Sequence, residues 1–296
     1  MPTAISREIA ATLLPMRPVE GHKGTFGHTF VIAGSRRYPG AMRLANEGAS
    51  RSGVGLVTAG MPESLRDVAA MTLLECMCLP LADTADGALG HVAIEAALDF
   101  STNIESVVLG PGLSTHPETK LFVHAVVPRI ESPLVIDADG LNSLSEDVSI
   151  LADRPPEATI LTPHPGEMAR LAGLDTREVQ DRRETVARDF AAEHKVVVIL
   201  KGHETVVASP TGEVAINTTG NNGMATGGSG DVLAGLLGGL LAQGLSTWGA
   251  ARLGVWLHGA AGDLAAEKLT ARAMIARDIV ANLPGAFTLL ESQAHG

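Results

Sequence analysis

Short apolar runs alternate with helix-like segments along much of this chain, and this alternation restricts the fold more than any other feature. The runs are HTFVIAG, GLVTAG, SVVLGPG, PLVIDADG, ATILTPHPG and VVVILKG. Short, continuous apolar runs are typical of parallel strands that are buried on both faces. Parallel strands need helical crossover connections between them. The sequence therefore predicts an α/β protein with a mostly parallel central sheet flanked by helices.

The segments between the runs support this prediction. Helical patterns cover residues 39–53, 92–100, 117–130 and 177–195. One hairpin interrupts the alternation, because TVVAS and EVAIN are joined by a turn at Pro210 to Gly212. We expect this hairpin towards one edge of the sheet, followed by a glycine loop and mainly helices. No repeat, linker or low-complexity run interrupts residues 1–296, so the chain is predicted to form a single domain.

Charge and composition exclude several classes of partner. The net charge is −11 and aromatic residues make up only 3% of the chain, which argues against a nucleic-acid partner. The N-terminal stretch lacks the pattern of a signal peptide, and the longest uncharged apolar run, VLAGLLGGLLA, is too short to span a bilayer. The prediction is a cytoplasmic protein with no membrane partner. Within that run, the spacing of Gly235 and Gly239 is interpreted as an allowance for close helix packing.

The two cysteines offer no disulfide. Cys76 and Cys78 lie two residues apart, so in a strand both would face the same side and could not easily form a bridge. No second pair of ligands accompanies them, which argues against a metal site. We interpret both as thiols of the core.

The stretch NNGMATGGSGDVLAG places four glycines in front of an apolar helical pattern. Glycine permits positive φ and close approach of another molecule, so the stretch predicts a loop shaped around a ligand. Ser229 is the expected N-cap, and the free amides and dipole of the first helical turn attract anions. Asp231 lies in this first turn, where it is either a favourable charge for the helix dipole or a catalytic base.

Polar and glycine-rich segments follow the predicted strands. In open α/β sheets, ligands bind beyond the carboxyl ends of the strands. Five strand ends and the helix start at the glycine loop are therefore expected to line one cleft. The five segments are Gly34 to Gly40, Gly110 to Ser114, Asp137 to Asn142, Thr162 to Glu167, and Lys201 to Glu204.

Three types of residue in this predicted cleft each have two possible interpretations. Pro163 and Pro165 hold His164 in a rigid stretch ahead of a helix, where it contacts a ligand or packs in the core. The carboxylates of DADGLN suit a metal or hydroxyl contact, or an Asx turn at Asp139. Lys201 either meets phosphate oxygens or lies on the surface. The sequence contains neither a Walker-type loop nor a dinucleotide fingerprint, so any nucleotide pocket is built differently.

Taken in order, these segments resemble the ADP/ATP-dependent NAD(P)H-hydrate dehydratases of the ribokinase-like superfamily. The resemblance covers about residues 20 to 245 and rests on GHKGTFGHTFVIAGS, GPGLS, VIDADGLN, LTPHPGEMARL, KGHETVV and GNNGMATGGSGDVLAG. The glycine loop with its aspartate is shared with the wider ribokinase-like kinases, whereas TPHPGE together with GNNGMATGGSGD specifies the dehydratases. The resemblance implies a three-layer ribokinase-like fold.

The resemblance also implies an activity. Members of the family repair NADH or NADPH that has gained water across a nicotinamide double bond. A nucleotide phosphorylates the added hydroxyl, phosphate leaves, and the reduced ring is restored. Bacterial members typically use ADP, release AMP and act on the S epimer, and Mg²⁺ is expected to bridge the phosphates.

The resemblance further implies three groups of site residues. The hydrated cofactor would contact Ala41, Gly112, His164 and Asp231. The nucleotide would contact Lys201, Gly202, His203, Glu204, Thr205 and Gly230. The transferring phosphoryl group would face the amides of Gly228, Ser229 and Gly230. Asp231 would act as the base that takes the proton from the attacking hydroxyl.

Partners and alternatives complete these expectations. Only about 20 residues precede the first motif, so epimerisation is expected from a separate protein, and a homo-oligomer, a tetramer, is expected from the family. The alternative function is a ribokinase-like kinase for a small vitamin precursor. A nucleotide sensor without turnover would be expected to lack the carboxylate at position 231. The sequence leaves open the choice of ADP or ATP and of NADH or NADPH hydrate.

Overall fold

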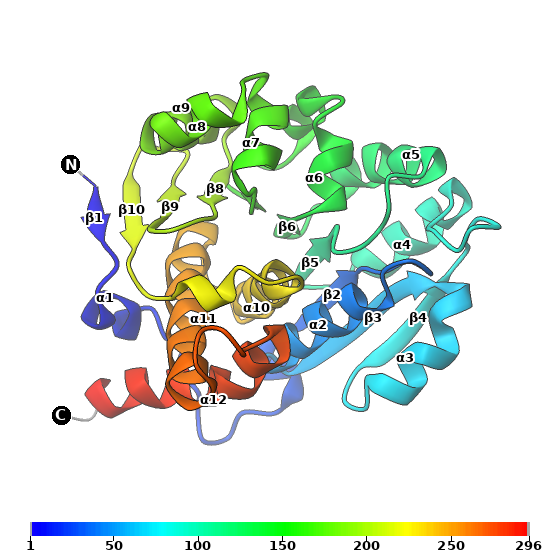
Figure 1. The fold of residues 1–296 in the computed structure, drawn as a ribbon. Coiled ribbons are helices and arrows are strands. Elements are labelled where there is room, and N and C mark those ends of the chain that lie inside the picture. The colour runs from blue at the N-terminus through cyan, green and yellow to red at the C-terminus, as the bar shows by residue number, and fades with distance from the viewer. Residues whose placement is uncertain (1, 295–296) are drawn as a thin grey trace.

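One mixed sheet organises the molecule. The computed structural model describes residues 2–294 of the 296-residue chain, and these contain a 10-stranded sheet in the order β1-β10-β9-β8-β7-β6-β5-β2-β3-β4 (Figure 1). The strands are β1 (Thr3–Ala4), β2 (His28–Ile32), β3 (Leu56–Pro62), β4 (Met77–Leu81), β5 (Ser106–Leu109), β6 (Leu134–Ile136), β7 (Thr159–Leu161), β8 (Val197–Leu200), β9 (Thr205–Ala208) and β10 (Val214–Asn217). All six apolar runs form strands, and strands β4 to β8 with β2 and β3 are paired in parallel. The prediction of a mostly parallel sheet is confirmed.

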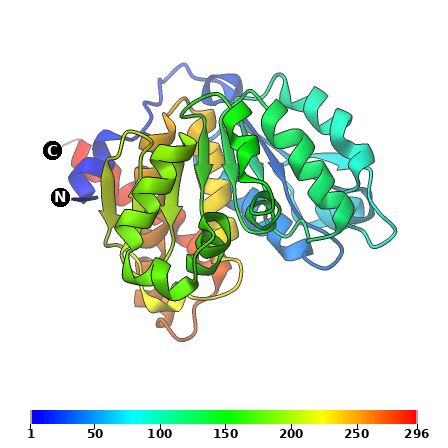
Figure 2. The same cartoon turned by 90° about the horizontal axis from the view of Figure 1, so that it is seen from above.

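Helices cover both faces of this sheet. They are α1 (Arg7–Thr12), α2 (Pro39–Ser50), α3 (Arg66–Thr72), α4 (Ile94–Ser101), α5 (Pro117–Val126), α6 (Asp139–Leu144), α7 (Pro165–Ala172), α8 (Thr176–Asp181), α9 (Arg183–His194), α10 (Ser229–Ala242), α11 (Thr247–Leu269) and α12 (Ala276–Ala294). Helices α4 to α9 lie on one face, and α2, α10, α11 and α12 lie on the other (Figures 1 and 2). The three layers agree with the ribokinase-like expectation.

Two hydrophobic cores separate the layers because strand side chains alternate between the faces. In β2, for example, Val31 belongs to the core under α2, α10 and α11, while its neighbours Phe30 and Ile32 belong to the core under α4 to α9. The strands are buried on both faces, which is why they read as continuous apolar runs in the sequence.

The predicted hairpin is present but is not the outermost element. Strands β9 and β10 pair antiparallel, and β9 also pairs antiparallel with β8. The short strand β1 then pairs in parallel with β10, through Thr3 opposite Ala215 and Ala4 opposite Ile216. Strand β10 therefore runs in the same direction as β8, and its carboxyl end lies at the same edge of the sheet.

Two local expectations were wrong. The helix predicted over 177–195 is broken into α8 and α9, because Arg182 leaves the helical region with φ −135°. Cys78 is exposed, since β4 is an edge strand, whereas Cys76 is partly buried against the core. The interpretation of a core thiol therefore fails for Cys78.

Helix α10 is buried along nearly its whole length and packs closely on α2. A Cβ atom at Gly235 would lie 1.8 Å from the backbone oxygen of Ala45, and one at Gly239 would lie 2.0 Å from Ser52 Oγ. Only glycine permits this approach, which confirms the packing interpretation of the two glycines. None of the helices within residues 2–294 combines the length and the apolar character needed to cross a membrane.

Candidate functional site

The carboxyl ends of β6, β7 and β8 bring together a charged cluster. Lys201, which follows β8, places its Nζ 2.7 Å from Asp137 Oδ1 and 3.8 Å from Glu167 Oε2. Thr162, which follows β7, donates from its hydroxyl to the same Asp137 oxygen at 2.7 Å. Three segments that are far apart in sequence thus meet at one edge of the sheet, as the strand-end rule predicts.

Lys201 is enclosed and paired rather than a surface residue. Its side chain is 21% exposed, and that of Asp137 is 1% exposed. Burial alone would lower the pKa of Lys201, but the carboxylates of Asp137 and Glu167 outweigh this effect and raise it. The surface alternative is therefore wrong, and the lysine presents a permanent positive charge at the end of β8.

Helix α10 points its first turn at this cluster. A Cβ atom at Gly230 would lie 3.2 Å from Lys201 Nζ and 3.6 Å from Asp137 Oδ2. Burial, followed by the negative charge of Asp137, raises the pKa of Asp231 to about 7, although Lys201 opposes the shift. A carboxyl group with a pKa near neutrality is well matched to proton transfer at physiological pH.

The start of α10 corrects one expectation. Gly228, not Ser229, is the N-cap, and its φ of 91° lies in the left-handed region that favours glycine. Ser229 is the first helical residue, and its carbonyl oxygen accepts a hydrogen bond of 2.9 Å from His258 Nε2. Burial lowers the pKa of His258 to about 4, so this histidine is neutral.

Asp137 and Asp139 bond to different neighbours. Asp139 Oδ2 accepts a hydrogen bond from the Ser114 amide at 2.8 Å, and its Oδ1 accepts one from Asn142 Nδ2 at 3.1 Å. It therefore ties the start of α6 to the loop after β5, while Asp137 pairs with Lys201. Within residues 2–294, no group of three or more His, Cys, Asp or Glu side chains is arranged to hold a metal ion.

His164 caps α7 and does not belong to the core. Its Nδ1 accepts hydrogen bonds from the amides of Gly166 at 3.0 Å and Glu167 at 3.3 Å, and the Glu167 carboxylate accepts one from the His164 amide at 2.7 Å. This is a capping box with histidine in the place usually held by serine or threonine. The ring is 52% exposed, and burial, with the charges of Lys201 and Arg170, lowers its pKa.

The capping role of His164 can be tested separately from any contact with a ligand. His164→Ala is expected to lower the free energy of unfolding by about 0.5–2 kcal/mol, the usual cost of losing an N-cap. His164→Asn, which keeps a capping oxygen, is expected to unfold like the parent. Urea unfolding of the three proteins is the measurement. Equal stability of His164→Ala and the parent would contradict the capping role.

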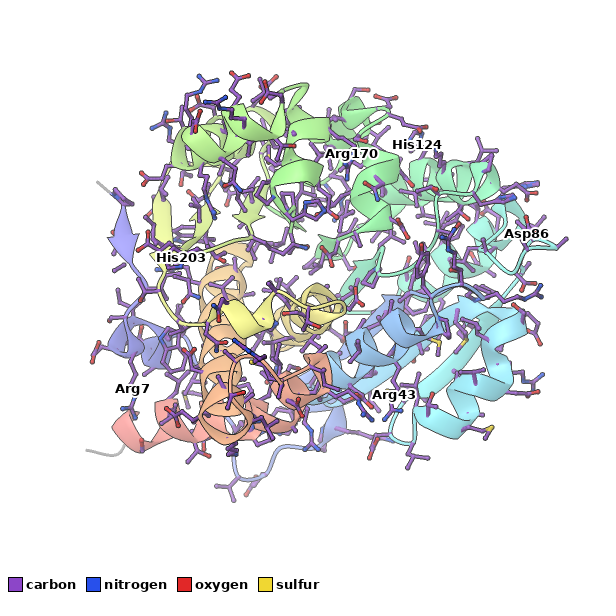
Figure 3. All side chains as sticks on the ribbon, in the orientation of Figure 1. Arg7, Arg43, Asp86, His124, Arg170 and His203 are labelled. Atoms are coloured by element: carbon purple, nitrogen blue, oxygen red, sulfur yellow. The ribbon has the colours of Figure 1, made fainter. Side chains whose placement is uncertain are left out.

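A cavity of about 740 Å³ opens beside the cluster. All the residues predicted to contact the nucleotide line it: Lys201, Gly202, His203, Glu204, Thr205 and Gly230. His203, labelled in Figure 3, lies on the loop that connects β8 and β9. His164 and Ser229 also line the cavity, whereas Gly228 and Asp231 are not among its lining residues.

One wall of the cavity was predicted only in part by the sequence analysis. It includes residues 221, 222, 224–226 and Leu233, which belong to the predicted ligand loop. It also includes residues 217–220 and, from α11, Val255 and His258, which the sequence analysis missed. The predicted hairpin was a signal for this wall. Its second strand, β10, runs parallel to β8, so the polar segment after β10 lies at the same edge of the sheet as the other strand ends. Asp263 of α11 holds this segment by accepting hydrogen bonds from the Gly220 amide at 2.8 Å and Asn221 Nδ2 at 3.0 Å.

Two predicted substrate-contacting residues, Ala41 and Gly112, lie together outside the cavity lining. A Cβ atom at Gly112 would lie 2.7 Å from Ala41 Cβ, so these two residues are adjacent. The loop of Gly112 is held by Asp139 through Ser114. Asp231, in the first turn of α10, is affected by the charge of Asp137, which pairs with Lys201 of the cavity lining, and by that of Asp139, which holds the Gly112 loop.

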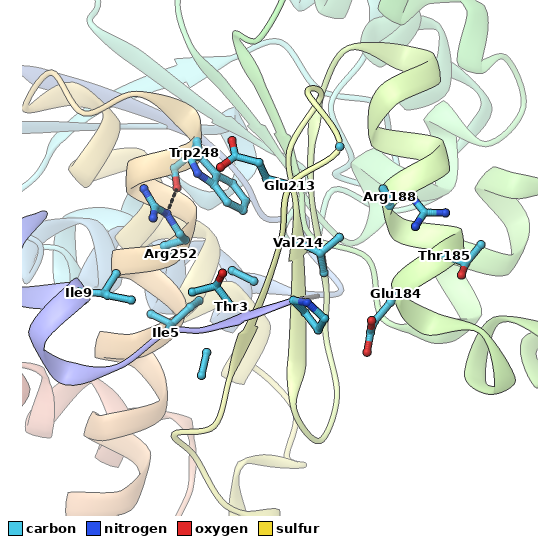
Figure 4. A pocket seen from close by; sticks show the side chains of 14 residues that line it. Thr3, Ile5, Ile9, Glu184, Thr185, Arg188, Glu213, Val214, Trp248 and Arg252 are labelled. Carbon is cyan, nitrogen blue, oxygen red and sulfur yellow. Dashed lines mark hydrogen bonds between the residues drawn. The ribbon is translucent and has the colours of Figure 1, made fainter.

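A second cavity, of about 400 Å³, lies across the sheet edge between β1, β10, α9 and α11 (Figure 4). Trp248 and Arg252 form part of its wall, and the arginine stacks on the indole ring. None of the predicted site residues lines this cavity. The candidate site is therefore the cavity at the carboxyl edge of the sheet.

The three layers and the glycine loop before α10 define a ribokinase-like α/β protein. A solved ribokinase-like superfamily protein from Enterococcus faecalis has this fold, with a TM-score of 0.83 and 26% identity over 98% of this chain and 95% of that one. The chain belongs to the NAD(P)H-hydrate dehydratase family, whose model matches residues 29–285.

Individual relatives agree with this membership. A bifunctional NAD(P)H-hydrate repair enzyme from Moorella thermoacetica is 44% identical over 95% of this chain and 53% of its own length. An ADP-dependent (S)-NAD(P)H-hydrate dehydratase from Xanthomonas campestris is 34% identical over 94% of this chain and 95% of its own. The solved ADP/ATP-dependent NAD(P)H-hydrate dehydratase of Bacillus subtilis, co-crystallized with ATP/Mg²⁺, is 30% identical, with a TM-score of 0.83 over 97% and 98% of the two chains. The chain spans about half the length of the bifunctional relatives that it matches.

Proposed function

We propose that this protein catalyses the nucleotide-dependent dehydration of hydrated NADH or NADPH to the reduced cofactor. The observation that carries the proposal is the place of Asp231 in the first turn of α10, next in the chain to Gly230 of the cavity lining, where burial raises the pKa of its carboxyl group to about 7. A positioned base of this kind is what phosphorylation of a hydroxyl group requires. Relatives named ADP-dependent (S)-NAD(P)H-hydrate dehydratase support ADP as co-substrate and the S epimer as substrate.

The nucleotide lies in the cavity in this proposal. Its phosphates approach Lys201 and the amide of Gly230 in the first turn of α10, whereas the Ser229 amide donates to the carbonyl oxygen of Thr226 at 3.4 Å. Positive charge and preorganised amides stabilise the charge that develops on a transferring phosphoryl group. The hydrated nicotinamide lies against Ala41 and Gly112 in this proposal, with its hydroxyl group near Asp231. His164, which lines the cavity, also contacts it.

Asp231 starts the reaction by taking the proton of the added hydroxyl group. The hydroxyl oxygen then bonds to the terminal phosphorus of ADP, the bond from that phosphorus to the bridging oxygen breaks, and AMP leaves. In the second step the carbon–oxygen bond breaks, and phosphate and a ring proton are lost. The double bond of the reduced nicotinamide is restored, and no oxidant or reductant is consumed.

The donor set fits a magnesium ion that arrives with the phosphates. Within residues 2–294 there is no all-protein metal cage, and Mg²⁺ usually needs only one or two carboxylates besides phosphate and water. Asp137 and Glu167, which flank Lys201, would supply them. When bound, the ion would neutralise phosphate charge in a strongly acidic site.

We further propose a cytoplasmic homo-oligomer, a tetramer, that acts as a single domain. The one sheet that joins β1 to β4 supports a single domain. An epimerase that converts the R epimer into the S epimer is the proposed pathway partner. The bifunctional names of several relatives support the coupling of this activity with a second one.

The test is incubation of the protein with hydrated NADH, Mg²⁺ and either ADP or ATP. We expect recovery of reduced-nicotinamide absorbance together with release of AMP or ADP. A stable phosphorylated product without recovery of absorbance would instead support a small-molecule kinase. Nucleotide binding without turnover would support a sensor.

A further inference from the structure

The loop between β8 and β9 has an unusual backbone. Gly202 has φ 145° and Glu204 has φ 54°, so two of the three residues between Lys201 and Thr205 have positive φ. The left-handed region is unfavourable for glutamate, and such a conformation persists only where surrounding contacts hold it. This loop lines the cavity, so its shape decides the shape of the cavity wall.

Arg183, the first residue of α9, supplies two such contacts, beside the hydrogen bond of 3.0 Å from the Thr205 hydroxyl to the Gly202 carbonyl oxygen. Its Nη2 donates to the carbonyl oxygen of Leu200 at 3.0 Å and to that of Glu204 at 3.3 Å. One nitrogen therefore joins the strand end before the loop to the residue that ends it. A Cβ atom at Gly202 would lie only 2.4 Å from Arg183 Nη1, so the loop is folded directly against the guanidinium group.

Arg183 acts behind the loop and not in the cavity. It is half-buried, and it is not among the residues that line the cavity. Its hydrogen bonds go to two backbone carbonyl oxygens, both from the Nη2 nitrogen. The break between α8 and α9 places this residue at a helix start, where its side chain reaches the loop.

We propose that Arg183 is a positioning residue for nucleotide binding, which holds the Gly202–Glu204 loop in its binding conformation. The proposal rests on the proposed function, in which this loop contacts the nucleotide. Arg183 does not contact the reacting atoms. Its loss therefore weakens nucleotide binding and leaves the chemical step intact once the site is saturated.

The test is calorimetric titration of Arg183→Ala with ADP, together with kcat at saturating ADP. We expect the Kd for ADP to rise about 10-fold, as for the loss of charge-assisted hydrogen bonds, while kcat stays within about twofold. Arg183→Lys is expected to fall between the two proteins and serves as the test protein if Arg183→Ala fails to fold. The ratio of the two Kd values should stay the same as the salt concentration rises. If Arg183 contacted the phosphates directly, salt would screen that attraction and the ratio would shrink.

Arg182→Ala is the matched control. Arg182 precedes Arg183, is exposed, and forms a surface ion pair with Glu178, so its loss removes the same charge without touching the loop. Its Kd for ADP should equal that of the parent. Gly202→Ala should also raise the Kd for ADP, because its Cβ would clash with the guanidinium group. When Gly202→Ala is added to Arg183→Ala, the clash is absent, and the further rise in Kd should be smaller than the rise that Gly202→Ala causes in the parent.

The outcomes separate the two proposals. A parent that binds neither ADP nor ATP overturns the proposed function. A parent that binds ADP, with an Arg183→Ala variant of equal Kd and a lower Tm, overturns the positioning role and leaves the proposed function standing.

Discussion

Lys201→Met is expected to destabilise the protein by about 3–5 kcal/mol, the range for breaking a buried ion pair from one side. Methionine keeps the length of the side chain but leaves Asp137, which is 1% exposed, without its counter-charge. Nucleotide binding is expected to weaken as well, since the cavity loses its positive charge. Guanidinium unfolding and ADP titration of the same preparation measure the two effects.

Two control variants test whether the destabilisation comes from the buried ion pair. Lys120→Met breaks an ion pair with Glu146 whose partners are 31% and 49% exposed, and it should cost about 0–1 kcal/mol. Adding Asp137→Asn to Lys201→Met should recover part of the lost stability, because no unpaired charge then remains. If Lys201→Met is as mild as Lys120→Met, the pair does not hold the three strand ends together.

The strands could be predicted because their burial is a local property of the sequence. Each apolar run is covered on both faces, so the pattern survives without knowledge of its neighbours. Gly235 and Gly239 were interpretable for a similar reason, since glycine inside an apolar helix indicates close packing. The cavity residues from Lys201 to Thr205 followed from the strand-end rule together with the family resemblance.

The features that were missed depend on contacts between distant segments. Strand β1 has only two residues and exists because it pairs with β10, more than 200 positions away. The partner of Lys201 lies 64 residues earlier in the chain, and no local pattern indicates it. The N-cap is Gly228, with φ 91°, and a Cβ there would lie 2.3 Å from Leu44 Cδ1, a tertiary contact that the local sequence does not indicate.

The same distant contacts set the acidity of the proposed base. Burial and the charges of Asp137, Asp139 and Glu167 raise the pKa of Asp231, while Lys201 lowers it. Loss of the Lys201 charge would therefore move the proposed base further from its ionised form. The ion pair at the end of β8 and the first turn of α10 thus form one electrostatic unit, and a variant of either changes the other.

Asp231→Asn is expected to lower kcat at least about 100-fold, the lower end for loss of a positioned base. Asparagine has nearly the same size but cannot accept the proton of the hydroxyl group. ADP binding should survive or tighten, because one negative charge near the phosphates is removed. Paired measurements of kcat by recovery of absorbance and of ADP affinity by calorimetry test both statements.

The pH dependence of the parent gives an independent test of Asp231. Its kcat/KM should rise with pH and level off above about 7, where the carboxyl group is ionised in the free enzyme. The contribution of Asp231 to the free energy of unfolding should show the opposite trend. A carboxyl group whose pKa is raised on folding costs stability as pH rises from its ordinary value of 3.8 towards about 7, at about 1.4 kcal/mol for each pKa unit. Asp231→Asn lacks this penalty, so the variant should unfold like the parent at pH 4 and be the more stable protein at pH 8. A variant that keeps kcat within a few-fold of the parent, and is less stable at pH 8, would make Asp231 a helix-start residue and not the base.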